Sequence, residues 1–360
     1  MTPDFWRGRR VLVTGHTGFK GAWLCLWLTR LGARVTGLSL PPAGDPNLWS
    51  LLRMDGVHHL TGDVADADLV QGVLDRERPE IVLHLAAQSL VRPSYRDPVG
   101  TFRTNVLGVV AVLAAAAKTP GVGSVVVVTS DKCYENLERD APYAEDDRMG
   151  GRDPYSASKG CAELAAASMR ASFFAPHAAG GHPARIATAR AGNVIGGGDW
   201  SEDRLIPDIV RGCLGPAGEV VLRYPAATRP WQHVLESLRG YLTLAEHLAA
   251  GTPGADSGWN FGPDRADERS VAEVAAAMVK GLGRGRVVTD PAAPTLHEAR
   301  ILRLDSTKAG RIGWRRGLTF ERTMRMTADW YMAWAAGQDA RALCEAQIDG
   351  YMQEIGTIDA

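Results

Sequence analysis

Short aliphatic runs alternate with stretches of helical periodicity through the first half of the chain. Because these runs are apolar throughout rather than at every second position, they are typical of parallel strands buried on both faces. The strands are expected at residues 10–14, 34–38, 57–61, 81–85, 124–129 and 185–189. The helices between them are expected near 19–32, 66–77, 99–118 and 155–174. The pattern predicts an α/β fold with a doubly wound parallel (Rossmann) sheet.

The regular alternation of expected strands and helices ends after residue 192. Gly- and Asp-rich loops such as "GNVIGGGDW" and "GPDRADERS" appear, and helices near 204–213, 234–249, 270–282, 319–336 and 339–355 are less regularly interleaved with strands. We therefore predict a Rossmann domain over 1–191 and a smaller mixed α/β substrate lobe. That lobe takes residues 192–232 and 262–360, while 233–261 returns to the sheet.

Two of the expected helices, 106–118 and 160–174, are apolar around most of their circumference. One apolar face can cover the sheet, but an apolar opposite face needs a second partner. We expect a homodimer that packs through the helices near 99–118 and 155–174.

Composition excludes several classes of partner. The chain has 360 residues, 45% hydrophobic, with a net charge of -1, which favours neither nucleic acid nor an anionic membrane. The N-terminus lacks the apolar segment of a signal peptide, and the apolar run 106–117 is shorter than the roughly 20 residues that span a bilayer. The 5 cysteines and 9 histidines show no metal-ligand spacing. We expect a cytoplasmic protein without a metal.

A glycine-rich loop follows the first expected strand. The segment "VLVTGHTGFKGAWL" places Gly15, Gly18 and Gly21 between a strand and a helix, where backbone N–H groups can face a pyrophosphate. The alternative is a glycine-rich turn with no ligand. Further cofactor contacts are expected from the loop itself and from the ends of the third and fourth strands: Thr17, Phe19, Val64, Leu85, Ala86 and Ala87.

The choice of dinucleotide depends on the end of the second strand. Ser39 stands where an acidic residue usually binds the adenosine ribose, and no arginine is adjacent to receive a 2′-phosphate. NAD is favoured over NADP, which the sequence does not exclude. Asp63, after the third strand, is a candidate to bind the adenine, or else a helix cap.

Tyr155 and Lys159 are spaced i, i+4 at the start of an expected helix and therefore share one face. A tyrosine needs its pKa lowered by about 3 units, or about 4 kcal/mol, to act as a base at neutral pH. One ammonium about 4 Å away can supply this at an effective dielectric constant of about 20. The alternative is two unrelated surface residues.

The segment "VVVVTSDKCYEN" ends a buried strand in Ser130, Asp131 and Lys132. Together with the glycine loop, Tyr155 and Lys159, this serine resembles the extended short-chain dehydrogenase/reductase family. The resemblance implies that Ser130 binds a sugar hydroxyl, Tyr155 takes its proton, and Lys159 holds the nicotinamide ribose.

The Asp131–Lys132 pair is similar to that of nucleotide-sugar 4,6-dehydratases, which need an acid and a base beside the serine. In the dTDP-glucose branch of that group the pair is Asp-Glu, so the lysine is a departure. The segments "GHTGFKGAWL", "TSDKCYEN" and "RPWQHVLE" resemble the branch that acts on CDP-glucose. The resemblance implies Asp131 as general acid and Lys132 as C5 base, provided that the amine is neutral. A surface ion pair is the alternative.

Candidate substrate contacts follow from the same resemblance and from phosphate chemistry, since guanidinium groups bind phosphates bidentately. The two arginines among them that would bind the pyrophosphate could instead form ion pairs. The candidates are Ser89, Arg92, Ser94, Asn193, Arg204 and Arg229. Three rival functions remain at this point: a dehydratase of a dTDP-, UDP- or GDP-sugar, a 4-epimerase, and a non-catalytic NAD-binding regulator.

Overall fold

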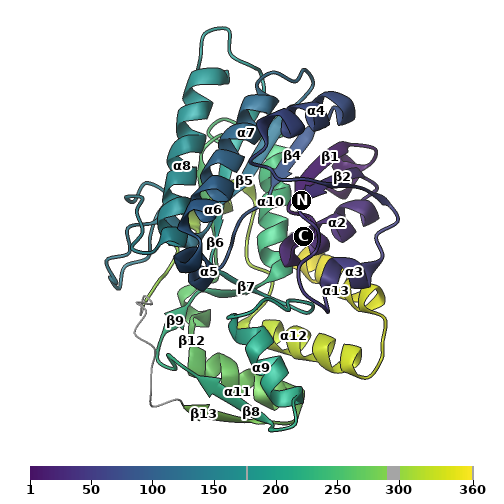
Figure 1. Cartoon of the computed structure of the whole chain (residues 1–360), viewed down its shortest axis with the longest axis vertical. Helices are drawn as coiled ribbons and strands as arrows, with labels where there is room; N and C mark the ends of the chain where they lie inside the picture. Colours follow the sequence, from purple (N-terminus) through teal and green to yellow (C-terminus); the bar gives the residue numbers. More distant parts are fainter. Residues whose placement is uncertain (176, 290–300, 359–360) are drawn as a thin grey trace.

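A seven-stranded parallel sheet organises the larger part of the molecule (Figure 1). The computed structural model of the protein describes residues 1–175, 177–289 and 301–358. The strands lie in the order β3-β2-β1-β4-β5-β6-β11, which confirms the expected doubly wound fold. Their bounds are β1 Arg10–Thr14, β2 Arg34–Ser39, β3 Val57–Thr61, β4 Ile81–His84, β5 Ser124–Val128, β6 Arg185–Ala191 and β11 Gly258–Phe261.

Helices cover both faces of this sheet. The helices α4 (Ala67–Glu77), α7 (Gly108–Ala116) and α8 (Pro154–Phe173) cover one face, and α2 (Phe19–Arg30) and α10 (Val234–Ala249) cover the other. The valines of β5 divide between the two cores, because successive side chains of a strand point to opposite faces. Val125 and Val127 pack on the α7 side, and Val126 and Val128 on the α2 side.

The apolar stretch before β5 is not one regular helix. It consists of α6 (Pro98–Phe102), a wider π-type turn over Arg103–Leu107, and α7. By length and composition alone, its 19 residues from Pro98 to Ala116 are long and apolar enough to cross a membrane. Half of that stretch is buried in the protein, where α7 packs between α4 and α8, as core helices do.

The smaller part lies beyond the carboxyl ends of the strands and contains short sheets of two strands each. The pairs are β7 (Asn193–Ile195) with β10 (Trp231–His233), β8 (Glu219–Leu222) with β13 (Arg286–Thr289), and β9 (Thr228–Arg229) with β12 (Arg269–Ser270). Its helices are α9 (Leu205–Leu214), α11 (Val271–Leu282) and α12 (Phe320–Ala335). Shorter elements elsewhere are α1 (Pro3–Trp6), α3 (Leu48–Leu52), α5 (Val91–Arg96) and the 3-10 turns η2 (Asp131–Cys133), η3 (Arg265–Asp267) and η4 (Thr307–Ile312).

The helix α13 (Ala340–Ile358) was expected in the substrate lobe. It packs against α12 of the smaller part and also against α2 and α3 beside the sheet. Tyr351 meets Trp27 of α2 edge to face at 5.8 Å, and Arg30 pairs with Asp349.

Candidate active site

The glycine loop between β1 and α2 has the geometry of a phosphate cradle. Gly15 has φ +73°, and a Cβ there would lie 2.7 Å from the Ala86 backbone. A Cβ on Gly21 would lie 2.2 Å from the Gly15 carbonyl oxygen. Gly18 is the N-cap of α2, and no side chain caps that helix. The unpaired N–H groups at this helix start can therefore bind an anion, so these residues fit a dinucleotide.

The polar residues beside β2 and β3 lie near the same loop. The Ser39 and Thr17 hydroxyl oxygens are 2.8 Å apart, and Thr17 donates to the Leu40 carbonyl at 3.0 Å. Asp63 does not cap α4, because Asp66 does so by accepting from the Leu69 N–H. Asp63 accepts from the Ala65 N–H and pairs with Arg103 at 3.1 Å. Its proposed contact with adenine stays a prediction.

The remaining expected cofactor residues differ in their surroundings. Leu85 and Ala87 line the central cavity described below. Val64 is buried in the core on the α7 side, next to Gly108. Phe19 is the first residue of α2, and Ala86 lies behind Gly15.

The strand β5 delivers Ser130, Asp131 and Lys132 to a tight 3-10 turn at its carboxyl end. The Ser130 hydroxyl donates to Asp131 Oδ1 at 2.9 Å and accepts from the Lys132 N–H at 3.2 Å. Asp131 is buried, and its Oδ2 has no hydrogen-bond partner within the protein. A buried carboxyl oxygen that lines a cavity without a partner is available to a ligand.

The environment of Asp131 raises the pKa of its carboxyl group. Burial raises the pKa of its carboxyl above the ordinary value, although Lys132, Ser130 and Arg229 act in the opposite direction. A neutral carboxylic acid can donate a proton, which is what a general acid requires.

Tyr155 and Lys159 lie in the first turns of α8, and both are buried. Burial raises the pKa of Tyr155 to about 12, and its hydrogen bond with Ser130 only partly offsets this. Burial lowers the pKa of Lys159 to about 8, although the nearby carboxylate of Glu163 acts to raise it. The expected lowering of the Tyr155 pKa by Lys159, with a contribution from an oxidised nicotinamide, stays a prediction, because in the cofactor-free protein burial keeps this pKa raised.

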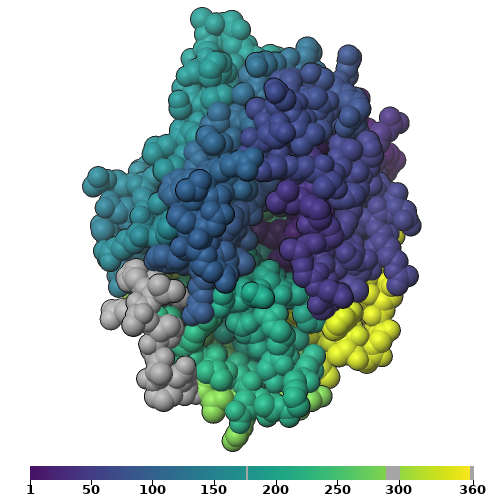
Figure 2. Space-filling view, in the orientation of Figure 1, coloured from purple at the N-terminus to yellow at the C-terminus, as the bar shows by residue number. Residues whose placement is uncertain are grey.

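These groups line one cavity of about 280 Å³ at the carboxyl ends of the strands. Figure 2 shows a hollow where the purple and blue N-terminal segments meet the green segment below them. The catalytic candidates that line the cavity are Ser130, Asp131, Lys132, Tyr155 and Lys159. The substrate candidates that line it are Ser89, Arg92, Asn193, Arg204 and Arg229.

Ser94 is the exception among the substrate candidates. It is fully buried, and its hydroxyl accepts from the Tyr155 N–H at 3.1 Å while donating to the Val91 carbonyl at 2.6 Å. The structure therefore does not support the expected sugar contact, because the Ser94 hydroxyl instead joins α5 to the start of α8.

Several residues that line the cavity were not predicted, among them Lys20, Asp203 and Arg223. Lys20, inside the glycine loop, lies 3.3 Å from the Tyr241 hydroxyl, and burial with the like charges of Arg204 and Lys159 lowers its pKa to about 7. Asp203 pairs with Arg223 at 3.0 Å and with Arg92 at 3.2 Å. A lysine inside a glycine loop was a visible signal, whereas Asp203 and Arg223 carry no motif. Across the described residues, no cluster of His, Cys, Asp or Glu could hold a metal ion.

Comparisons with known proteins agree with this geometry. The model of the NAD dependent epimerase/dehydratase family matches residues 11–285. A CDP-glucose 4,6-dehydratase from Salmonella typhimurium is 44% identical over 356 residues, which cover 98% of each chain. The fold is similar to a UDP-glucose 4-epimerase from Thermotoga maritima, with a TM-score of 0.77, 22% identity and coverage of 91% of this chain and 99% of that one. It is also similar to a double mutant of dTDP-glucose 4,6-dehydratase from Streptomyces venezuelae with NAD bound, with a TM-score of 0.73, 26% identity and coverage of 89% and 96%.

Proposed function

Because the chain belongs to the NAD dependent epimerase/dehydratase family, we propose that it is a CDP-glucose 4,6-dehydratase. The product is CDP-4-keto-6-deoxyglucose, formed by loss of one water across C5 and C6. The observation that carries this proposal is the shared cavity, which joins Ser130, Tyr155 and Lys159 to an adjacent acid and amine, Asp131 and Lys132. The 44% identical relative, which aligns over 98% of both chains, supports the CDP-linked substrate.

When bound, NAD would supply the hydride-transfer chemistry between C4 and C6 of the sugar. The close backbone approach at Gly15 and Gly21 and the uncapped start of α2 at Gly18 support binding of its pyrophosphate there. Lys159 would bind the nicotinamide ribose with its ammonium and favour the phenolate of Tyr155.

Protons move through the residues of the β5 turn and of α8. Tyr155 takes the proton of the C4 hydroxyl, which Ser130 holds by a hydrogen bond. Lys132 then takes the C5 proton, and the electrons of the C5–H bond form the C5–C6 double bond as the C6–O bond breaks. Asp131 gives its proton to the departing hydroxyl, so that water leaves. Lys132 returns a proton to C5 as the hydride reaches C6.

Four arginines around the cavity suit the diphosphate of a nucleotide sugar. They are Arg92, Arg204, Arg223 and Arg229. Arg204 reaches from the smaller lobe to the Ser89 hydroxyl at 3.1 Å, so it spans the cleft in which the diphosphate would lie. Guanidinium groups bind phosphate oxygens in pairs, which orients the sugar toward Tyr155.

The test is incubation of the purified protein with CDP-, dTDP-, UDP- and GDP-glucose, with mass spectrometry for loss of one water. We expect water loss from CDP-glucose at the highest rate. Water loss from another nucleotide sugar only would keep the mechanism and overturn the substrate. Loss from none of them would contradict the proposed function.

We also infer that two copies associate through α6, α8 and the turn between α6 and α7. The exposed fractions of Val99, Leu107 and Leu164 are 77%, 55% and 61%, and α8 packs against both other elements. These side chains form an apolar patch of the kind that marks an interface. Sedimentation should give a dimer at micromolar concentration and a monomer for Leu164→Arg, and a wild-type monomer would contradict the proposal.

The cytoplasm is the expected location, where thiols stay reduced. All five cysteines are free thiols, and four of them are buried, which is compatible with a reducing compartment. The two-lobe division also remains part of this proposal, with the diphosphate bound between the lobes.

A further inference from the structure

Tyr134 lies directly beyond the catalytic turn and is almost completely buried. The turn is held at its start by β5, which ends at Val128. At its far end, the Cys133 carbonyl accepts from the Gly150 N–H at 2.8 Å, and Tyr134 follows. Lys132 is therefore held between a rigid strand on one side and the Tyr134 side chain on the other.

The Tyr134 hydroxyl has two charged or polar partners. It donates to Asn260 Oδ1 at 2.7 Å and accepts from Arg190 Nη1 at 2.7 Å. The Arg190 guanidinium also lies 5.1 Å from the centre of the Tyr134 ring. These contacts use the hydroxyl as both donor and acceptor, so its direction is fixed.

Arg190 continues this network to α8. Its Nε and Nη2 donate to the two oxygens of Glu163 at 2.9 and 2.8 Å. Glu163 lies one turn beyond Lys159 on α8, and it also accepts from the hydroxyls of Thr129 and Thr188. The helix that carries Tyr155 and Lys159 and the turn that carries Asp131 and Lys132 are thus joined at one buried centre.

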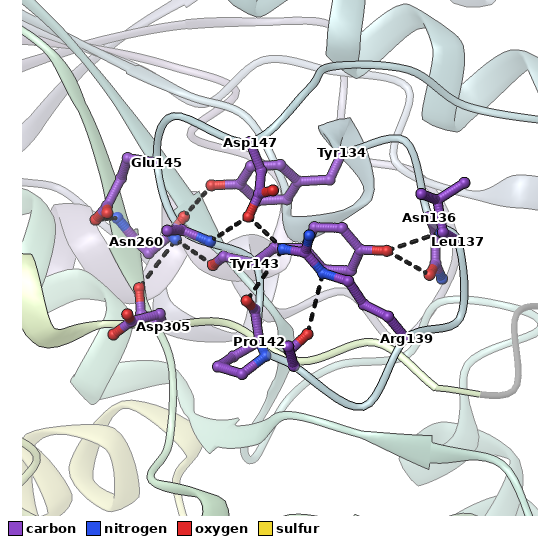
Figure 3. A network of polar contacts seen from close by, with 12 residues as sticks. Tyr134, Asn136, Leu137, Arg139, Pro142, Tyr143, Glu145, Asp147, Asn260 and Asp305 are labelled. Atoms are coloured by element: carbon purple, nitrogen blue, oxygen red, sulfur yellow. Dashed lines mark hydrogen bonds and ion pairs between the residues drawn. The ribbon is translucent and has the colours of Figure 1, made fainter.

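Asn260 connects the same centre to a third segment. Its Nδ2 donates to the carbonyls of Tyr143 at 2.9 Å and Asp305 at 3.0 Å, and its N–H donates to Glu145. Figure 3 shows Tyr134 above Asn260 and beside the ring of Tyr143. The Tyr134 and Tyr143 rings stack at 5.3 Å.

We propose that Tyr134 is a positioning residue that holds Asp131 and Lys132 in register with Tyr155 and Lys159. This inference rests on the acid and base roles proposed above. Oxidation at C4 uses groups on α8 and Ser130, at the end of the turn next to β5. Elimination uses Asp131 and Lys132, which lie toward the end of the turn that Tyr134 holds. Loss of the hydroxyl should therefore slow elimination more than oxidation, since a misplacement of about 1 Å can cost about a hundredfold in rate.

The test compares Tyr134→Phe with Tyr143→Phe. Tyr143 is the stacked neighbour, and its hydroxyl contacts Leu137 and Asn136 rather than Arg190. For Tyr134→Phe we expect kcat to fall about ten- to a hundredfold with little change in KM. Reduced cofactor should accumulate on substrate, and exchange of the C5 proton with solvent should slow. Tyr143→Phe should show neither change.

A second variant and a measurement without substrate make the test independent of one substitution. Asn260→Ala removes the other partner of the Tyr134 hydroxyl and should show the same preferential loss of elimination. In the free protein, backbone amides of Ser130 to Tyr134 should exchange faster with deuterium in Tyr134→Phe than in Tyr143→Phe. An equal loss of oxidation and elimination, or unchanged kcat, would overturn the inference.

The Lys132→Met variant distinguishes a failure of the proposed base role of Lys132 from a failure of the positioning role of Tyr134. If C5 exchange survives in Lys132→Met, the proposed base is wrong and the positioning role falls with it. If Lys132→Met blocks exchange while Tyr134→Phe does not slow it, the base stands and only the positioning role is overturned.

Discussion

Glu163 and Arg190 form an ion pair inside the protein, with Arg190 Nη2 2.8 Å from Glu163 Oε2 and each side chain 5% exposed. Burial alone would raise the pKa of Glu163, but Arg190 holds it below the ordinary value. Glu163 of α8 also accepts hydrogen bonds from Thr129, directly after β5, and from Thr188 of β6, so the pair connects the parts of the fold that carry the site.

Removal of one charge from this pair should lower the stability of the folded protein. Glu163→Gln leaves Arg190 buried without a counter-ion, and the free energy of unfolding should fall by about 3–5 kcal/mol. Urea-induced unfolding would measure this. Arg7→Ala, which removes the exposed pair with Asp4, is the control and should change stability little. Equal effects of the two substitutions would contradict the buried pair as a source of stability.

The rate of dehydration should depend on the protonation of Asp131. Burial raises its pKa, and a general acid works only while protonated, so the rate should fall as pH rises through that pKa. Asp131→Asn cannot donate this proton, so kcat should drop by about a hundredfold or more and lose this dependence. A kcat–pH profile of both proteins checks the prediction. A high-pH decline that persists unchanged in Asp131→Asn would assign it to another group.

Substitution of Gly21 should weaken the binding of NAD. In Gly21→Ala the new methyl group would lie 2.2 Å from the Gly15 carbonyl oxygen, so the loop must shift away from the pyrophosphate. We expect NAD to bind at least about tenfold more weakly, which is about 1.4 kcal/mol. Isothermal titration calorimetry would measure it. The control is Gly72→Ala on α4, where a Cβ meets nothing within 4 Å and NAD affinity should not change.

Asp203 should compete with the substrate for two arginines. Its carboxylate lies between Arg92 and Arg223, where a phosphate of the substrate would bind. Asp203→Asn should therefore bind CDP severalfold more tightly, with an affinity that falls more steeply with salt. Titration of both proteins with CDP at two ionic strengths would measure the affinity and its salt dependence. Weaker binding by Asp203→Asn would instead indicate that this carboxylate contacts the nucleotide.

The sequence predicted what depends on local pattern. The limits of β1 and β3 agree with the expected strands, and those of α10 agree with the expected helix, because hydrophobic periodicity is a property of neighbouring residues. The motif residues also converge as expected, because parallel strands place their carboxyl ends along one edge.

Long-range packing was not predictable in this way. Nothing in the sequence of α13 indicates that it covers α2, and a serine near a strand end, such as Ser94, looks the same whether it meets a sugar or a helix start. Lys20 was missed because the glycine pattern indicates contacts of the backbone and assigns no role to the lysine between Gly18 and Gly21. Asp203 and Arg223 meet through tertiary packing, which leaves no local pattern.

The contact between α2 and α13 has a consequence for folding. Arg30 and Asp349 are 319 positions apart in the chain, yet their side chains pair where α2 meets α13. Such distant contacts close large loops and therefore form late and slowly. During synthesis, the surface of α2 that α13 covers stays exposed until the C-terminal helix has been translated. We therefore expect nascent chains to acquire NAD affinity late, after the substrate lobe has been translated.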